Sequence, residues 1–238
     1  MCRHIGYLGP AVPVADLLTR GNHSVMTQAW APRQMRGGGT VNADGFGVGW
    51  WAAHRFSRYR NPMPIWTDPA VTEVLPQISA TAVLGAVRSA TAGMPVERSA
   101  CAPFTDGHWA FSHNGVVPDW PGLLRWTAAP TESATDSAAV WALLAAELQR
   151  QDPVAAIRAV IRRIIAAAPG ARLNLLLGDG TRFWATTWYH SLWSLVDAGT
   201  VILASEPYDD DPRWQEIADR RLVTAVPGQV TIDALQEE

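Results

Sequence analysis

The chain has 238 residues, of which 48% are hydrophobic and 17% charged, and its formal net charge is −3. This composition is typical of a globular chain that forms one large domain or two small ones. The arginines are spread rather than clustered, which argues against a nucleic-acid partner. No apolar run approaches the roughly 18 residues that a membrane span needs, so we expect no membrane partner, and the sequence leaves the oligomeric state open.

Two cysteines, Cys2 and Cys101, are too few for a disulfide framework or a zinc site. The opening of the chain lacks the basic and apolar regions of a signal peptide, so we expect a cytoplasmic protein. We expect Cys101 to be a buried, inert thiol. Metal-binding and nucleotide-binding motifs are missing, and the sequence therefore predicts neither a metal nor a cofactor.

The first half of the chain has strand character, followed by two helices. Strands are expected at residues 2–9, 48–53, 81–88 and 108–115, where β-branched or aromatic residues lie near Gly or Pro. Ser133 to Asp136 matches an S-x-x-D capping signature, and the apolar residues after it have helical spacing, which predicts a helix from about 135 to 150. Asp152-Pro153 predicts a second helix, which ends at Pro169-Gly170.

Strand character returns after Gly170. Strands are expected at residues 172–178, 181–188, 191–196 and 200–206, with a hairpin turn at 178–180. Strands, paired helices and strands again, with no linker between them, predict one α+β domain over residues 2–238 with two packed sheets. The loops at 30–41 and 205–215 are long enough to be functional.

The first candidate functional residue is Cys2. If the initiator Met1 is removed, Cys2 carries both a thiol and a free α-amine. A free thiol has a pKa of about 8.5 and an α-amine about 7.7 to 8.0, so the amine can act as a base for the thiol at neutral pH. If Met1 stays, Cys2 is an ordinary thiol near a chain end. Position alone leaves both interpretations open.

The second candidate is the His-Asn-Gly run that ends at Gly115. Asn-Gly is the strongest short signal for a hairpin turn, which is the structural interpretation. In a chemical interpretation, the Asn114 amide and the Gly115 N–H offer two donors to one point, as an oxyanion hole requires. Glycine also lets a substrate approach the backbone closely.

Two further candidates carry charge. Arg88 ends a predicted strand, where an arginine commonly forms a structural ion pair but can also grip a carboxylate with its planar fork. Asp136 begins a predicted helix, where it suits the helix dipole but could also hold an ammonium group. An Arg and an Asp that face one cleft would together bind the head group of an α-amino acid.

These residues, in this order, resemble the class II glutamine amidotransferases, which are N-terminal nucleophile hydrolases. The resemblance covers roughly the first 210 residues and implies a four-layered αββα sandwich. It also implies that Cys2 attacks a side-chain amide after removal of Met1. The motif residues that match the family are Cys2, Arg88, Ala90, Thr91, His113, Asn114, Gly115 and Asp136.

Within the family, seven blocks in order resemble the γ-glutamyl hydrolases of ergothioneine biosynthesis. They are MCRHIGYLG, NADGFGVGW, AVRSATAGMP, PFTDGHWAFSHNGVV, ARLNLLL, ATTW and LASEPYDDD. The resemblance implies hydrolysis of γ-glutamyl-hercynylcysteine sulfoxide through a thioester on Cys2. Many ammonia-producing members carry an Arg three residues before the position of Asp44, where this chain has Val41, and this departure argues against a glutamine-specific enzyme.

In this interpretation, Arg88 and Thr91 hold the substrate carboxylate, Asp136 holds its ammonium group and His113 belongs to the binding site. The leaving portion would carry a trimethylammonium group, which aromatic faces commonly hold. Candidates for that contact, each of which could instead be core or solvated loop, are Trp30, Trp50, Trp51 and the acidic loop from Glu206 to Asp211. Asn174 is a candidate for site architecture, because a buried strand Asn needs partners.

Two other functions remain open from the sequence. One is a stand-alone glutaminase or an amidotransferase subunit that releases ammonia from glutamine. The other is a binding protein that keeps the fold without the chemistry, which retention of Met1 would favour.

Overall fold

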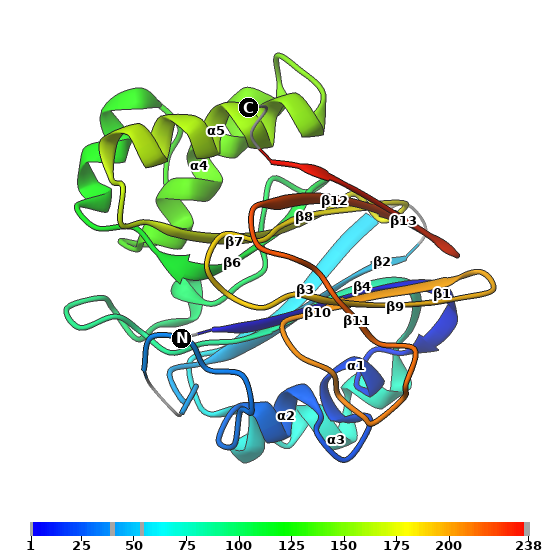
Figure 1. Cartoon of the computed structure of the whole chain (residues 1–238). Coiled ribbons are helices and arrows are strands. Elements are labelled where there is room, and N and C mark those ends of the chain that lie inside the picture. The colour runs from blue at the N-terminus through cyan, green and yellow to red at the C-terminus, as the bar shows by residue number, and fades with distance from the viewer. Residues whose placement is uncertain (1, 39–40, 53–54, 236–238) are drawn as a thin grey trace.

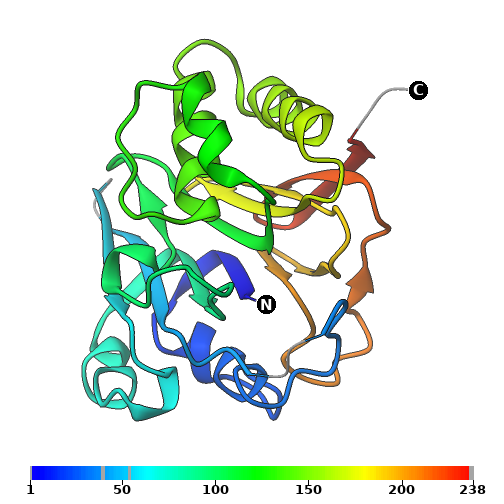
Figure 2. The same cartoon turned by 90° about the vertical axis from the view of Figure 1, so that its left-hand side faces the viewer.

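The computed structural model describes residues 2–38, 41–52 and 55–235. Two antiparallel sheets stack face to face, and helices cover the outer side of each (Figure 1). The view turned by 90° shows the beginning of the strand Arg3–Pro13, in dark blue, in the middle of the molecule (Figure 2). The predicted α+β fold, a four-layer αββα sandwich, is confirmed.

The strands of the larger sheet are described here in their spatial order, with β1 in the middle. Its seven described strands are β11 (Gln215–Glu216), β9 (Trp193–Asp197), β10 (Thr200–Ala204), β1 (Arg3–Pro13), β4 (Ser79–Val87), β2 (Phe46–Ala52) and β3 (Arg55–Asn61). The smaller sheet has six described strands, again in spatial order. They are β13 (Gln229–Ala234), β12 (Arg221–Val226), β8 (Phe183–Thr186), β7 (Arg172–Gly178), β6 (Ala110–Val116) and β5 (Phe104–Thr105).

Two long helices, α4 (Asp136–Leu148) and α5 (Pro153–Ala167), cover the smaller sheet (Figure 1). Short helices cover the larger sheet, and 3₁₀ turns complete the described helices. These short elements are α1 (Asp16–Thr19), α2 (Val25–Gln28), α3 (Ala70–Glu73), η1 (Ile65–Thr67), η2 (Leu75–Gln77), η3 (Arg98–Ala100) and η4 (Trp120–Trp126). Across the described residues, no helix combines the length and the apolar character needed to cross a lipid bilayer.

The central strands are buried on both faces. On β1, Ile5 and Tyr7 pack in the core beneath the short helices, whereas Leu8 lies in the core that both sheets share. On β7, Leu175 packs against the long helices and Leu176 lies between the sheets. Side chains of a strand alternate between its two faces, so one strand serves two cores.

The second predicted helix is confirmed, and the start of the first needs a correction. Asp152 caps α5 by accepting hydrogen bonds from two backbone N–H groups. The cap of α4 is Thr135, whose side chain accepts from the Ala138 N–H, and not Ser133. The Ser133 hydroxyl instead donates to Glu97 at 2.7 Å, and Thr135 has the extended backbone that an N-cap requires.

All eight predicted strands exist; the one expected at 172–178 matches β7 at both ends, and the other seven have shifted ends. The strand expected at 2–9 extends to Pro13 as β1, and the one expected at 181–188 is limited to β8. Residue 53, at the end of another expected strand, lies outside the described residues. The sequence patterns did not indicate the edge strands β3, β5, β11 and β13, the inner strand β12, or the short helices.

The Asn-Gly pair is not a hairpin turn. It lies inside β6, where Asn114 pairs with Asn174 and Gly115 pairs with Leu173 on β7. A Cβ atom on Gly115 would collide with the carbonyl oxygen of Arg172. Glycine is therefore required here because two backbones approach closely.

We expect Gly115→Ala to lower the free energy of unfolding by about 1–3 kcal/mol, because the strands must separate to admit the methyl group. Urea denaturation measures the change. Gly122→Ala is the matched control: a Cβ at Gly122 has no neighbour within 4 Å, so its effect should stay within about 0.5 kcal/mol. Equal stability of the two variants would contradict the close approach.

Candidate active site

Three of the predicted site residues line one small cavity. Cys2 precedes β1, Arg88 follows β4, and His113 lies on β6, so both sheets contribute. The remaining lining residues are Phe46, Ala86, Val87, Ala100, Ala102, Phe104, Ser112 and Ser137.

The register of the larger sheet explains why Cys2 and Arg88 meet. Arg3 of β1 pairs with Val87 of β4 in antiparallel register, so the next residues outward, Cys2 and Arg88, are opposite one another. The Cys2 side chain is half-buried, and its Sγ lies 3.9 Å from the carbonyl oxygen of Ser89. Met1 lies outside the described residues, so its removal stays a prediction.

The Arg88 guanidinium is held by main-chain carbonyl groups. Its Nη1 donates to the carbonyl oxygen of Pro95 at 2.9 Å and to that of Asp44 at 3.4 Å. The side chain is 7% exposed, and within the described part of the chain it forms no ion pair. The remaining donors of the fork are thus able to meet an anion in the cavity. Thr91 is exposed on the following loop and does not line the cavity.

His113 and Asn114 point to opposite faces of β6, as neighbours in a strand must. His113 faces α4: its Nε2–H donates to the carbonyl oxygen of Arg172 at 2.8 Å, and its Nδ1 accepts from the Ser137 hydroxyl at 3.1 Å. Asn114 is fully buried and its Nδ2 donates to Ser205 Oγ over a long 3.5 Å, while its Oδ1 has no partner among the described residues. Neither Asn114 nor Gly115 lines the cavity with Cys2, and the long hydrogen bond leaves the Asn114 amide nitrogen weakly bonded.

Asp136 is the first residue of α4 and is 4% exposed. Its carboxylate accepts from the backbone N–H of Val117 at 3.0 Å and from that of Ser137 at 2.7 Å. These contacts match the helix-terminus interpretation of the residue. Asp136 does not line the cavity, but its neighbour Ser137 does, so the carboxylate lies next to the cavity wall.

Asn174 organises the segment after β8. Its Oδ1 accepts from the backbone N–H of Trp188 and of His190, both at 3.0 Å, and its Nδ2 donates to the carbonyl oxygen of His190 at 2.8 Å. Tyr189, between the two donors, has a φ of 94°, which few non-glycine residues adopt. The predicted need of Asn174 for buried partners is met by this turn.

The sequence analysis missed two residues of this region, His190 and Ser205. His190 is 2% exposed and both ring nitrogens lack a partner among the described residues; burial, with the charges of Arg3 and Arg172, lowers its pKa to about 3. Ser205 Oγ accepts from the backbone N–H of His4 at 3.0 Å and also contacts Asn114. Ser205 lies in the block LASEPYDDD, but the block does not indicate the contacts of Ser205, and His190 lies in no quoted block. The fold is needed to reveal the position of both residues.

The aromatic candidates do not line the cavity with Cys2. Trp51 is part of the core between the sheets, and its indole N–H donates to the carbonyl oxygen of His108 at 3.2 Å. Trp50 packs against the core under the short helices, and Trp30 is 46% exposed beside Trp66. Trp50 and Trp51 therefore have the alternative role considered from the sequence, that of core residues.

Cys101, in contrast to Cys2, is fully buried. Its Sγ lies 3.5 Å from the carbonyl oxygens of Asn61 and Glu97, and burial raises its pKa to about 11. The predicted buried, inert thiol is confirmed in its burial. Within the described residues, no group of three or more His, Cys, Asp and Glu could hold a metal ion.

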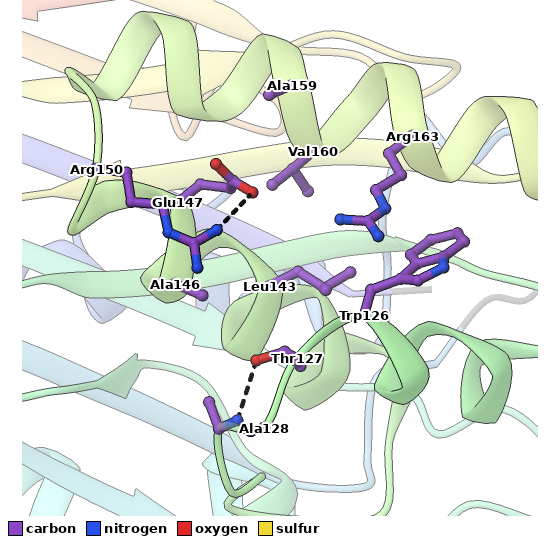
Figure 3. Close-up of a pocket in the computed structure, with 11 residues that line it drawn as sticks. Trp126, Thr127, Ala128, Leu143, Ala146, Glu147, Arg150, Ala159, Val160 and Arg163 are labelled. Carbon is purple, nitrogen blue, oxygen red and sulfur yellow. Dashed lines mark hydrogen bonds and ion pairs between the residues drawn. The ribbon is translucent and has the colours of Figure 1, made fainter.

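A second cavity, of about 290 Å³, lies between η4, α4 and α5 (Figure 3). The Arg163 guanidinium stacks 4.5 Å from the ring centroid of Trp126, and Arg150 lies 3.9 Å from Glu147 at its rim. None of the predicted catalytic or binding residues lines this cavity. The site residues thus gather at the smaller cavity, where the two sheets meet.

Two bacterial relatives match this chain over nearly its whole length. A protein of Mycobacterium tuberculosis named gamma-glutamyl-hercynylcysteine sulfoxide hydrolase is 43% identical, with 99% of this chain and 97% of the relative covered. A protein of Mycolicibacterium smegmatis with the same name is 42% identical, with 99% and 100% covered.

The fold also matches a solved structure. It is a class II glutamine aminotransferase domain protein of Silicibacter pomeroyi, with a TM-score of 0.72 at 21% identity, 99% of this chain and 100% of that chain being covered. The family model described as "Glutamine amidotransferases class-II" matches residues 22–198. The chain therefore belongs to the class II glutamine amidotransferase family.

Proposed function

We propose that the protein hydrolyses the γ-glutamyl amide bond of γ-glutamyl-hercynylcysteine sulfoxide and releases glutamate and hercynylcysteine sulfoxide. The observation that carries the proposal is that Cys2, Arg88 and His113 line one cavity. The near full-length match to hydrolases of that name supports the choice of substrate. Because the match covers nearly the whole chain, we assign residues 2–238 to one catalytic domain.

Recognition of the glutamyl group uses two charges. Arg88 grips the α-carboxylate with the donors that Pro95 and Asp44 leave open, and Thr91 assists from the loop after β4. Asp136, next to the cavity wall, holds the α-ammonium group. Two opposite charges at fixed separation select an amino-acid head group and leave the γ-amide directed at Cys2.

Catalysis begins with the Cys2 thiol. After removal of Met1, the α-amine of Cys2 takes the thiol proton, and Sγ attacks the γ-carbonyl carbon. The Asn114 amide and the Gly115 N–H stabilise the oxyanion. The protonated amine then donates to the leaving nitrogen, the C–N bond breaks and a thioester remains; water hydrolyses the thioester and releases glutamate.

Free glutamine is the alternative substrate, because it offers the same γ-amide and head group. The family includes enzymes that use glutamine, which keeps this candidate open. Relative kcat/KM on glutamine and on the larger amide separates the two functions. The proposal includes a small-molecule substrate and no nucleic-acid partner. It also includes a cytoplasmic location, whose reducing conditions keep the Cys2 thiol free.

We expect untagged protein to lack Met1 in an intact-mass measurement, and Cys2→Ala to reduce kcat/KM for glutamate release by at least about three orders of magnitude, since no other group forms the thioester. Cys101→Ala is the control, because its buried thiol faces main-chain carbonyls. Release that survives Cys2→Ala would contradict the proposed mechanism. Retention of Met1 would also contradict it and would favour the binding protein. Faster turnover of glutamine would favour the glutaminase.

We expect Arg88→Lys to raise KM for the γ-glutamyl substrate by about 10- to 150-fold, because an ammonium group cannot replace two parallel N–H donors, a loss of about 1.5–3 kcal/mol. Steady-state kinetics measures the change. Arg58→Lys is the control, since Arg58 also binds a carboxylate and a carbonyl but does not line the cavity. A fall in kcat at constant KM would argue against the carboxylate grip.

A further inference from the structure

Arg3, the residue after the candidate nucleophile, is buried with its charge. Its side chain is 1% exposed, and its Nε donates to Glu206 Oε1 at 3.0 Å. Its other two nitrogens donate to main-chain oxygens: Nη1 to Cys2 at 3.2 Å and Nη2 to Gln34 at 2.9 Å. The guanidinium therefore holds the main chain of Cys2 directly.

Glu206 is the counter-charge of Arg3 and is equally buried, at 1% exposure. Its Oε2 accepts from three donors: His23 Nε2 at 3.3 Å, the backbone N–H of Arg33 at 2.8 Å and that of Gln34 at 3.0 Å. A buried carboxylate is tolerated when it is paired and hydrogen-bonded, as here. One side chain thus joins the start of β1 to the loop at 33–34 and to the segment after β10.

Sheet register places this pair. Ile5 of β1 pairs with Ala204 of β10 in antiparallel register, which continues outward to put Arg3 opposite Glu206. On the other side of β1, Cys2 is opposite Arg88 in the register with β4. Cys2 is therefore held laterally by contacts to both neighbouring strands, through Arg3 on one side and through the Ser89 carbonyl on the other.

These contacts favour a structural role of Glu206 over the predicted contact with the cationic end of the substrate, although Glu206 also lines a surface pocket with Asp209, Asp210 and Asp211. A carboxylate that meets a ligand cation needs an accessible oxygen, whereas Oε2 already has three donors and Oε1 binds Arg3. Asp210, an exposed acidic residue further along the same loop, forms an ion pair with Arg33 at the surface.

We propose that Glu206 is a positioning residue: through Arg3 it fixes the main chain of Cys2 so that the thiol and the α-amine face the cavity. The inference rests on the proposed function, because its kinetic test measures the release of glutamate. A displacement of about 1 Å in a reacting group can reduce rate by about 100-fold, so loss of this contact acts on kcat. Substrate affinity, which depends on Arg88 and Asp136, is affected much less.

The test compares Glu206→Gln, Glu206→Asp and Arg3→Lys with wild type, each shown by intact mass to lack Met1. We expect Glu206→Gln to lower kcat by about 10- to 100-fold with less than about a threefold change in KM. Glu206→Asp should recover part of kcat because it keeps the charge. Arg3→Lys keeps both charges but loses the donor to the Cys2 carbonyl, so it should lower kcat as Glu206→Gln does.

Glu132→Gln is the matched control, since Glu132 is also held by arginines, Arg58 and Arg60, and does not line the cavity. This variant should lower the free energy of unfolding but leave kcat close to that of wild type. If Glu206→Gln does not fold, Glu206→Asp and Arg3→Lys decide the question, because they retain the buried charges. A rise in KM at unchanged kcat, or unchanged kinetics in the variants that fold, would overturn the proposal.

Alkylation of Cys2 by iodoacetamide, followed on the N-terminal peptide by mass spectrometry, separates this inference from the proposed function. It needs no substrate, and the buried Cys101 is the internal reference. We expect on the order of tenfold slower alkylation of Cys2 in Glu206→Asp and Arg3→Lys, since the thiol loses its aligned base. Unchanged alkylation would overturn the positioning role even if glutamate release were observed; slower alkylation without any glutamate release from wild type would overturn only the substrate.

Discussion

Burial of the central strands on both faces is the constraint on which the rest of this structure depends. β1 lies in the middle of the larger sheet, with a core under the short helices on one side and a core shared with the smaller sheet on the other. Any polar side chain that points inward from such a strand must find a partner, because an unpaired buried polar group is costly. The positions of the polar side chains near the start of β1 therefore depend on the partners that they find in one another.

Some of the inward-facing polar groups satisfy this requirement through contacts between the sheets, whereas His4 Nε2 and Asn114 Oδ1 have no partner among the described residues. Ser205, at the end of β10, binds the main chain of His4 on β1 and also the Asn114 amide on β6. Burial lowers the pKa of His4 to about 3, so this side chain stays neutral beside Arg3. A site whose parts hold each other in low-energy contacts is preorganised, which is the condition for electrostatic stabilisation of a transition state.

Local patterns in the sequence were sufficient for the layers but not for the contacts across them. The helix α5 and the hairpin before β8 follow from an N-cap and from Gly180, which adopts a φ of 89°. The edge strand β3, with the sequence RFSRYRN, lacks clear alternation because its two aromatic residues, Phe56 and Tyr59, are three residues apart and its other residues are polar. The contacts of Glu206 with Arg3 and of Ser205 with His4 depend on register between strands that are far apart in the chain, and no short motif encodes that register.

The proposed nucleophile, Cys2, would stand at the chain end after removal of Met1, directly before the Arg3 of the Arg3–Glu206 ion pair. A residue inside a strand is held by peptide bonds on both sides, but Cys2 without Met1 would have one covalent neighbour only. Non-covalent contacts then have to hold the residue, and the structure shows one on each side: the Ser89 carbonyl near Sγ and the Arg3 guanidinium on the Cys2 carbonyl. The Arg3 guanidinium is itself anchored by Glu206. A buried charge pair one residue from Cys2 thus suits the proposed catalysis by an N-terminal cysteine.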